Sequence, residues 1–430
     1  MSKKTAAILL SALMLVGLMA GCSSTSSSST GGTSTPATPG STPASTGSEA
    51  GGDSSTPATG GENISLRVWG PQEEQALLKE MCEAFAAENP DNTYTFEYGV
   101  VGENDARDRF LEDPAAAADV FMFANDHLRD LVKASALYEV TRNRDDIISR
   151  NVEGSVAAAS LDEALYAYPM TADNGYFLYY DSSVLSEDDV QTLDGILAVA
   201  NENGKKVFMD VSNGYYIVSF FFGAGDNIWL EGDAQKCDFN NEAGLAAAES
   251  IKTFTADPAF ITGEDAIITG GMGESIIAGV SGVWNAEALQ EKLGDNFAAT
   301  KLPTFTLNGE QAQMGSFAGY KLVGVNSLTS QPVAAMDLAN WLTNQENQTK
   351  RFETRQLGPS NTAAAADPAV KENIALNALA MQSAYAKPQN DVLGGFWNPA
   401  EAFGNALEAK DYSVDLQTML DNLVSQVEAG

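Results

Sequence analysis

Histidine, cysteine and basic residues are scarce in this chain of 430 residues. One histidine and three cysteines, none of them in a CxxC pair, give no pattern for a zinc site. Lysine and arginine number 24 against 58 aspartates and glutamates, for a formal net charge of −34. Such a surface repels nucleic acid and anionic lipid, and it favours a neutral or cationic ligand.

Motifs that bind a nucleotide cofactor or build a hydrolase are also missing. No glycine cluster has the GxGxxG spacing or a following Lys-Ser/Thr, and no GxSxG sequence occurs. His127 stands beside an aspartate without a nucleophile, and we expect it at a helix start or on the surface. We therefore expect no cofactor, no metal and no catalytic residues.

An apolar run of the ~20 residues that a spanning helix needs is likewise absent. Residues 1–21 instead have a short basic start, an apolar stretch over Ala6–Met19 and a small-residue end, which predicts a secretory signal peptide. The string Leu18 to Cys22 resembles a bacterial lipobox. The resemblance implies cleavage before Cys22, lipid on its thiol, and anchoring at the extracellular face of the cell membrane.

The segment after the lipobox is rich in Ser, Thr, Gly and Pro, and it has no aromatic or large aliphatic side chain as far as residue 60. Such a composition cannot offset the entropy lost on ordering, so residues 22–61 are predicted to be a lipidated, disordered stalk. The rest of the chain is longer than one core usually holds, which predicts two lobes.

Short apolar strands alternate with amphipathic helices after the stalk, which indicates an α/β fold. Helices are predicted over Glu73–Glu88, around Gln331–Phe352 and over Val414–Val427. Cys82 lies on the apolar face of the first helix, and a disulfide between Cys82 and Cys237 remains an alternative to two free thiols. Strands are predicted over Ile64–Trp69, Tyr94–Val100, Asp119–Phe123, Tyr166–Pro169, Tyr176–Tyr180, Lys206–Val211, Val280–Trp284 and Lys321–Asn326.

From residue 64 onward, the order of the segments resembles the carbohydrate solute-binding proteins of ABC transporters, the maltose/maltodextrin-binding group in particular. The similarity is spread over several short segments. They are Ile64–Trp69, Asp119–Asp126, Tyr168-Pro169-Met170 with Tyr179-Tyr180-Asp181, Val280–Trp284 with Val283 where proline is usual, Leu302-Pro303, Phe317–Asn326, and Gly358–Asn361.

The resemblance implies a two-lobed periplasmic-binding-protein-like fold, with a ligand cleft between lobes joined by crossing segments. Residues 62–170 with 317–366 would form the first lobe, and residues 171–316 with 367–430 the second. It implies an extracellular receptor, expected to be a monomer, that captures a sugar or oligosaccharide, most similar to a maltodextrin, and delivers it to the membrane permease of an ABC transporter.

A sugar needs flat aromatic surfaces for its C–H faces and polar side chains for its hydroxyls. Trp284, Trp397 and Trp69 lie at strand ends or in irregular segments, where we expect ligand contact. The segment around Trp397 resembles the one that supplies a stacking aromatic in the family, and Tyr215 resembles another stacking position. For Trp69 and Tyr215, core packing and ligand contact are equally open. Trp341 lies at core spacing on a helix, and Trp229 follows an apolar run, so both are predicted to be structural.

Two acidic residues resemble family positions that bind sugar hydroxyls: Asp126 after a buried strand, and Asp173 after the crossing strand. A carboxylate that accepts hydroxyl donors makes a charge-assisted contact. The alternative for Asp126 is a helix N-cap. Gln72 begins the first helix, where capping and ligand contact are both open.

Two other functions remain as alternatives. The same receptor fold could take a polyamine or another small solute, for which the acidic and aromatic composition is suited. A surface-anchored glycosidase would need two carboxylates across a glycosidic bond, and with 58 acids such pairs arise by chance. The segment order favours a binding protein, not an enzyme.

Overall fold

The computed structural model describes residues 61–430. The predicted signal peptide, Cys22 and nearly all of the predicted stalk lie outside the described residues. No helix in the described part of the chain is long and apolar enough to cross a membrane.

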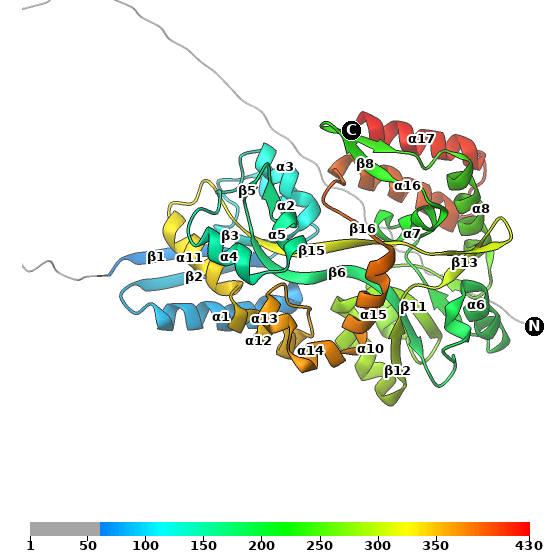
Figure 1. Cartoon of the computed structure of the whole chain (residues 1–430), viewed down its shortest axis with the longest axis horizontal. Helices are drawn as coiled ribbons and strands as arrows, with labels where there is room; N and C mark the ends of the chain where they lie inside the picture. Colours follow the sequence, from blue (N-terminus) through cyan, green and yellow to red (C-terminus); the bar gives the residue numbers. More distant parts are fainter. Residues whose placement is uncertain (1–60) are drawn as a thin grey trace, which may run out of the picture. The chain divides into compact units, whose positions relative to one another are not determined.

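Two long strands, β6 (Tyr168–Asp181) and β15 (Ser316–Val325), lie antiparallel and side by side and connect the two lobes (Figure 1). The main sheet has the strand order β10-β7-β11-β6-β15-β3-β1-β2, so β6 and β15 lie in its middle. β12 pairs with β6, and β16 pairs with β15. The other strands of this sheet are β1 (Asn63–Gly70), β2 (Thr93–Val100), β3 (Val120–Ala124), β7 (Lys206–Phe208), β10 (Phe260–Ile261), β11 (Ile276–Gly282), β12 (Phe297–Thr300) and β16 (Ala386–Pro388).

Three small hairpins supplement the main sheet, and helices cover it. The hairpins pair β4 (Ser160–Leu161) with β5 (Ala164–Leu165), β8 (Ile228–Glu231) with β9 (Ala234–Cys237), and β13 (Thr304–Leu307) with β14 (Glu310–Gln313). The helices before the second long strand are α1 (Gln75–Glu88), α2 (Ala106–Glu112), α3 (Leu128–Lys133), α4 (Arg144–Arg150), α5 (Glu153–Ala158), α6 (Leu193–Glu202), α7 (Gly214–Ala224), α8 (Glu242–Ala256), α9 (Asp265–Gly271) and α10 (Ala286–Leu293). Those after it are α11 (Pro332–Leu342), α12 (Gln345–Arg355), α13 (Thr362–Ala365), α14 (Pro368–Glu372), α15 (Ile374–Gln382), α16 (Trp397–Glu408) and α17 (Leu416–Ala429).

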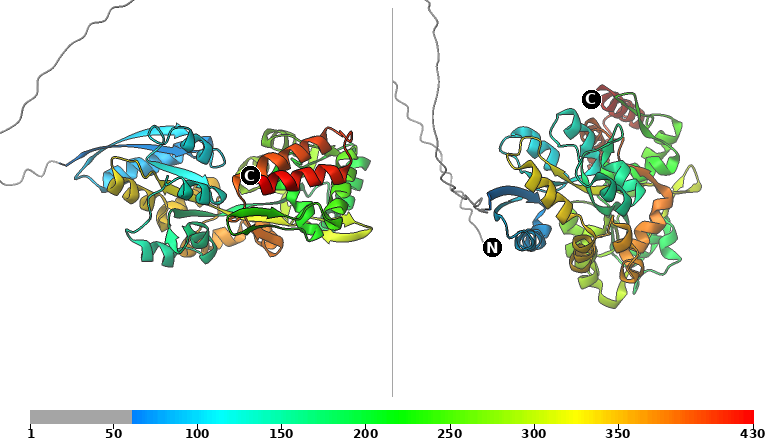
Figure 2. Two further views of the ribbon diagram at one scale, coloured as in Figure 1. Left: turned by 90° about the horizontal axis from the view of Figure 1, so that it is seen from above. Right: turned by 60° about the vertical axis from the view of Figure 1, so that its left-hand side comes forward.

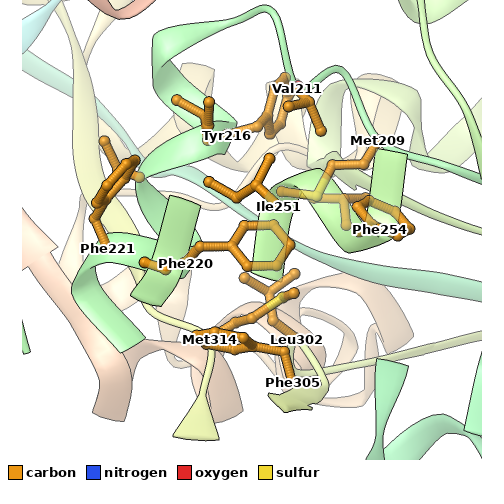
Figure 3. Packing of buried hydrophobic residues seen from close by; sticks show 14 of the residues in the cluster. Met209, Val211, Tyr216, Phe220, Phe221, Ile251, Phe254, Leu302, Phe305 and Met314 are labelled. Atoms are coloured by element: carbon orange, nitrogen blue, oxygen red, sulfur yellow. The ribbon is translucent and has the colours of Figure 1, made fainter. Parts of the chain in front are cut away.

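Each lobe has its own hydrophobic core. The first-lobe core joins β1, β3, α1 and α11, and it includes Leu66, Phe121 and Leu338, all fully buried. In the second lobe, α7 carries the apolar run Ile217–Phe222 and packs against α8 and α16. α17, the red helix at the C-terminus in Figure 2, packs against α8 and α16. Phe220 of this run packs against Phe305, with ring centroids 4.9 Å apart (Figure 3). A two-lobed α/β fold, as expected from the sequence, is confirmed.

Two predictions divide or join elements wrongly, and the predicted strands Lys206–Val211 and Val280–Trp284 have other bounds in β7 and β11. The predicted strands Tyr166–Pro169 and Tyr176–Tyr180 are one continuous strand, β6, whose polar middle remains paired with β15. The predicted long helix Gln331–Phe352 is two helices, α11 and α12. Asn344 begins the second of them, and its side chain accepts a hydrogen bond from the Asn347 amide, which is an N-cap.

Three predictions about single side chains need correction or sharpening. Trp229 is 41% exposed on the β8–β9 hairpin and is not a core residue, because the apolar run before it ends within α7. Trp341 packs against the first-lobe core but is only half-buried, and its Nε1 donates to the Met81 carbonyl at 2.9 Å. Cys82 and Cys237 are both free and buried, and burial raises the pKa of each thiol to about 12.

Candidate ligand-binding site between the lobes

The first part of the site follows β3. All five residues of β3 are buried, and the chain then turns through a 3₁₀ helix, η2 (Asn125–His127). Asn125 holds this turn, because its Oδ1 accepts from the Tyr320 amide at 2.8 Å and its Nδ2 donates to Asn390 Oδ1 at 2.6 Å. Asp126 is only 5% exposed, and its Oδ1 accepts no hydrogen bond from the protein. The side chain of Asp126 makes no N-cap bond, so the capping alternative is not seen.

His127 is buried directly beside this carboxylate, with its Nε2 3.8 Å from Asp126 Oδ2. It begins a helix as expected, but the expectation that it could lie on the surface is wrong. Burial lowers its pKa below the usual histidine value, although Asp126 acts in the opposite direction. His127 is therefore a neutral ring at physiological pH.

The second carboxylate, Asp173, lies in the middle of β6 and is 1% exposed. Its Oδ2 accepts a hydrogen bond from the Gly358 amide at 2.6 Å, whereas its Oδ1 has no well-formed partner in the protein. Burial raises the pKa of Asp173, and Lys321, the Thr171 hydroxyl and the Gly358 amide partly offset this rise.

Tyr215 comes from the second lobe, in the first turn of α7, which Asn213 caps by accepting from the Tyr215 amide. Its ring stacks on Phe317 at 5.9 Å and lies edge-on to Tyr176 at 4.8 Å. Its hydroxyl is buried without a hydrogen-bond partner in the protein. The pKa of Tyr215 is raised well above its usual value, first by burial, then by two neighbouring tyrosines and by Asp126 and Asp173. The charges of both carboxylates therefore act on the same hydroxyl.

Trp284 completes an aromatic pair with Tyr215, with ring centroids 6.4 Å apart. It lies in a 3₁₀ helix, η4 (Val283–Asn285), directly after β11, and is half-buried. Its Nε1 donates to Asp265 Oδ2 at 3.0 Å, which fixes the indole plane. The indole ring lies directly against the backbone of Gly282. A Cβ atom at that position would be 2.0 Å from the ring, so only glycine fits there.

Lys321 and Glu103 also belong to this site, and the sequence reasoning missed both. Lys321 lies on β15, is 9% exposed, and has its Nζ 3.4 Å from Glu103 Oε1. The same ammonium lies 5.8 Å from the centroid of the Trp284 ring. Burial acts to lower the pKa of Lys321, but the carboxylates of Glu103, Asp173 and Glu74 outweigh it and raise that pKa. A lysine at the start of the apolar strand Lys321–Asn326 was the sequence feature that could have indicated a functional role.

We call Glu103, Asp126, Asp173, Tyr215, Trp284 and Lys321 the interlobe site. Four of the seven predicted ligand residues fall within it. Trp397 is half-buried and adjoins it indirectly, because its ring lies 5.9 Å from Phe317, on which Tyr215 stacks. Trp69 is half-buried against Phe121 and Gly99 in the first lobe, and Gln72, in η1 (Gln72–Glu74), is exposed and makes no capping bond.

The arrangement suits the binding of a polyol. Carboxylate oxygens accept from ligand hydroxyls, the tyrosine hydroxyl and the lysine ammonium donate, and the indole offers a flat apolar face. Within residues 61–430, no group of three or more His, Cys, Asp or Glu side chains is arranged to hold a metal ion.

Comparison with known proteins gives a consistent result. The family model described as bacterial extracellular solute-binding protein matches residues 80–378. The galactooligosaccharide-binding protein of Bacillus subtilis is 27% identical over 359 residues, covering 78% of this chain and 83% of that protein.

Among solved structures, a chain with acarbose is 32% identical, with a TM-score of 0.78, and the match covers 85% of this chain and 99% of that one. A maltodextrin-binding protein from L. casei without ligand is 25% identical, with a TM-score of 0.71 and the same coverage. The relatives from Bacillus subtilis and L. casei are both named as binding proteins. The matched family covers more than half of the sequence, so this chain belongs to the bacterial extracellular solute-binding proteins.

Proposed function

We propose that this protein is the sugar receptor of an ABC transporter, which captures an oligosaccharide of the maltodextrin type outside the cell and delivers it to the membrane permease. The observation that supports this most is a set of buried polar atoms. Asp126 Oδ1, Asp173 Oδ1 and the Tyr215 hydroxyl come from three different elements, and each lacks a well-formed hydrogen bond within the protein. A buried polar group without a partner costs roughly 1–3 kcal/mol, which a ligand hydroxyl would recover.

The aromatic and charged groups around these atoms would contact different parts of a sugar. A sugar ring would place its C–H face on Trp284, while its hydroxyls donate to Asp126 and Asp173. Because the groups come from both lobes, a ligand that contacts all of them stabilises the closed arrangement over the open one. The free energy by which the ligand favours the closed state equals the difference between its binding free energies for the closed and the open state.

A polyamine receptor is the weaker alternative. The carboxylates of the interlobe site would suit a polycation, but the ammonium of Lys321 already lies among them, 3.4 Å from Glu103. A second ammonium group at the same place would meet like-charge repulsion.

Calorimetric titration of the purified protein against maltotriose, a galacto-oligosaccharide and spermidine tests the proposal. We expect saturable binding of at least one oligosaccharide together with a rise in melting temperature, because the ligand binds only the folded state. Asp126→Asn should weaken that binding without lowering the melting temperature, whereas Asp145→Asn, at an exposed first-lobe aspartate, should change neither. Binding of spermidine without any oligosaccharide would overturn the proposal.

The anchor is a separate part of the proposal. Cys22 would carry the lipid, and residues 22–61 would form the stalk that holds the lobes away from the membrane. Cys22→Ala should release the protein into the medium or leave it unprocessed. Membrane retention and processing equal to wild type, measured by cell fractionation, would contradict the lipid anchor.

A further inference from the structure

Lys321 has an unusual position for a lysine. It lies in the interior of the main sheet, where β15 pairs with Ala124 of β3 on one side and with Thr171 of β6 on the other. The register with β6 shifts between Gly319 and Lys321 and again between Lys321 and Leu322. Irregularities of this kind turn a side chain away from the direction that regular alternation would give it.

The ammonium of Lys321 joins groups from the two lobes. Glu103, at 3.4 Å, belongs to the loop after β2 in the first lobe, and the Trp284 ring, at 5.8 Å from its centroid, follows β11 in the second. The bond from Trp284 Nε1 to Asp265 fixes that ring. A cation within this distance of an indole face is attracted by the ring quadrupole. Lys321 is thus held between a carboxylate and the aromatic surface proposed for sugar stacking.

We propose that Lys321 is a specificity-determining residue of the interlobe site: it donates hydrogen bonds to the oxygen atoms of a neutral sugar unit at Trp284 and excludes a unit that carries an ammonium group. The proposal rests on the proposed function. A sugar unit that stacks on Trp284 lies beside the ammonium, which Glu103 keeps in place. A hydroxyl can accept from that ammonium, whereas an alkylammonium group in the same position only adds like charge.

The carboxylates around Lys321 imply that removing its ammonium should reverse the ligand preference. Glu103, Asp173 and Glu74 act together on the ammonium of Lys321. If the ammonium is removed, the buried Asp173 and the half-buried Glu103 are left without their cation, and a ligand amine becomes the group that best replaces it. The Lys321→Met variant is therefore expected to reverse the preference between a neutral ligand and its amine-bearing analogue.

The experiment compares maltotriose with maltotriose analogues in which one hydroxyl of a terminal unit is replaced by an amine, titrated calorimetrically at pH 6.5. We expect the wild type to bind maltotriose roughly ten-fold or more tightly than the amine analogues, the scale of one charge-assisted hydrogen bond. Lys321→Met should bind maltotriose more weakly and prefer an amine analogue. Lys321→Arg should keep the wild-type preference, because it keeps the charge.

Lys301→Met is the matched control. Lys301 also lies over an aromatic ring, 5.5 Å from the centroid of Tyr385, but is not part of the interlobe site, and its variant should show the wild-type preference. Melting curves establish that each variant is folded, and Lys321→Gln serves in the same comparison if Lys321→Met does not fold. A folded Lys321→Met or Lys321→Gln variant with unchanged preference would overturn the inference. A wild type that binds no sugar would instead overturn the proposed function.

Discussion

The two lobes contribute different chemistry to the interlobe site. The first lobe, with the strand that leaves it, supplies the charged groups Glu103, Asp126, Asp173 and Lys321. The second lobe supplies aromatic surface from Tyr215 and Trp284. Charged groups fix the orientation of hydroxyls, and aromatic faces give apolar contact area without fixing direction. Under the proposed function, a ligand would obtain specificity from one lobe and contact area from the other, so it would need both lobes.

The buried charges of the first lobe also differ from surface charges in what they do for stability. Arg351 and Glu74 are 1% and 2% exposed and lie 3.2 Å apart. Arg351→Met leaves Glu74 buried without its cation, so we expect the free energy of unfolding to fall by about 3–5 kcal/mol. Arg142→Met removes a half-exposed ion pair with Asp337 and should cost about 0–1 kcal/mol. Chemical denaturation of both variants measures the difference, and equal losses would show that burial does not distinguish the two pairs.

Substituting Trp341 and Trp284 distinguishes a tryptophan that packs in the core from one proposed to contact the ligand. Trp341→Ala should lower the free energy of unfolding by about 3 kcal/mol, because it leaves a cavity beside Phe85 and breaks the bond to Met81. Sugar affinity should then be unchanged under folding conditions. Trp284→Ala should instead weaken sugar binding by about 1–3 kcal/mol with little loss of stability. Melting curves measured beside titrations test both predictions. A Trp284→Ala variant that binds sugar normally would contradict the role of Trp284 as a sugar-stacking residue.

Asp226, in the second lobe, is a buried carboxylate, and no lysine within residues 61–430 lies as close to it as Lys321 lies to Glu103. Burial raises its pKa to about 6, which the hydrogen bond from Asn241 only partly offsets. Because the folded protein holds this proton more tightly than the unfolded chain, the group costs stability as the pH rises from about 4 through about 6. Asp226→Asn should therefore be more stable than wild type at pH 7 by at most about 3 kcal/mol, with the difference disappearing near pH 4. A difference that does not change with pH would contradict this account.

The sequence predicts the fold, and four of its proposed ligand residues belong to the interlobe site because of the local sequence pattern around them. Asp126 follows the uniformly apolar β3, Trp284 follows β11, and Tyr215 begins a helix after a short strand. β7 and β11 are neighbours in the sheet, which brings Tyr215 and Trp284 together. β6 and β15 lie between β11 and β3, so the position of Asp126 relative to Trp284 depends on the two long strands as well.

The errors arise where a tertiary contact overrides the local pattern. The site position of Lys321 depends on the register shift beside it, and alternation of polar and apolar residues cannot show such a shift. Helical periodicity continues across Asn344, so it conceals the break between α11 and α12. Trp229 follows an apolar run that ends in a helix, and a hairpin then carries it to the surface.

The fixed indole of Trp284 has an optical consequence. An ammonium group lies near its ring, and a half-buried indole emits light at a wavelength that depends on the charges and solvent around it. Ligand bound on the ring face would change both. Ligand binding should therefore change the part of the protein's tryptophan fluorescence that comes from Trp284, and this change can be measured without an added label.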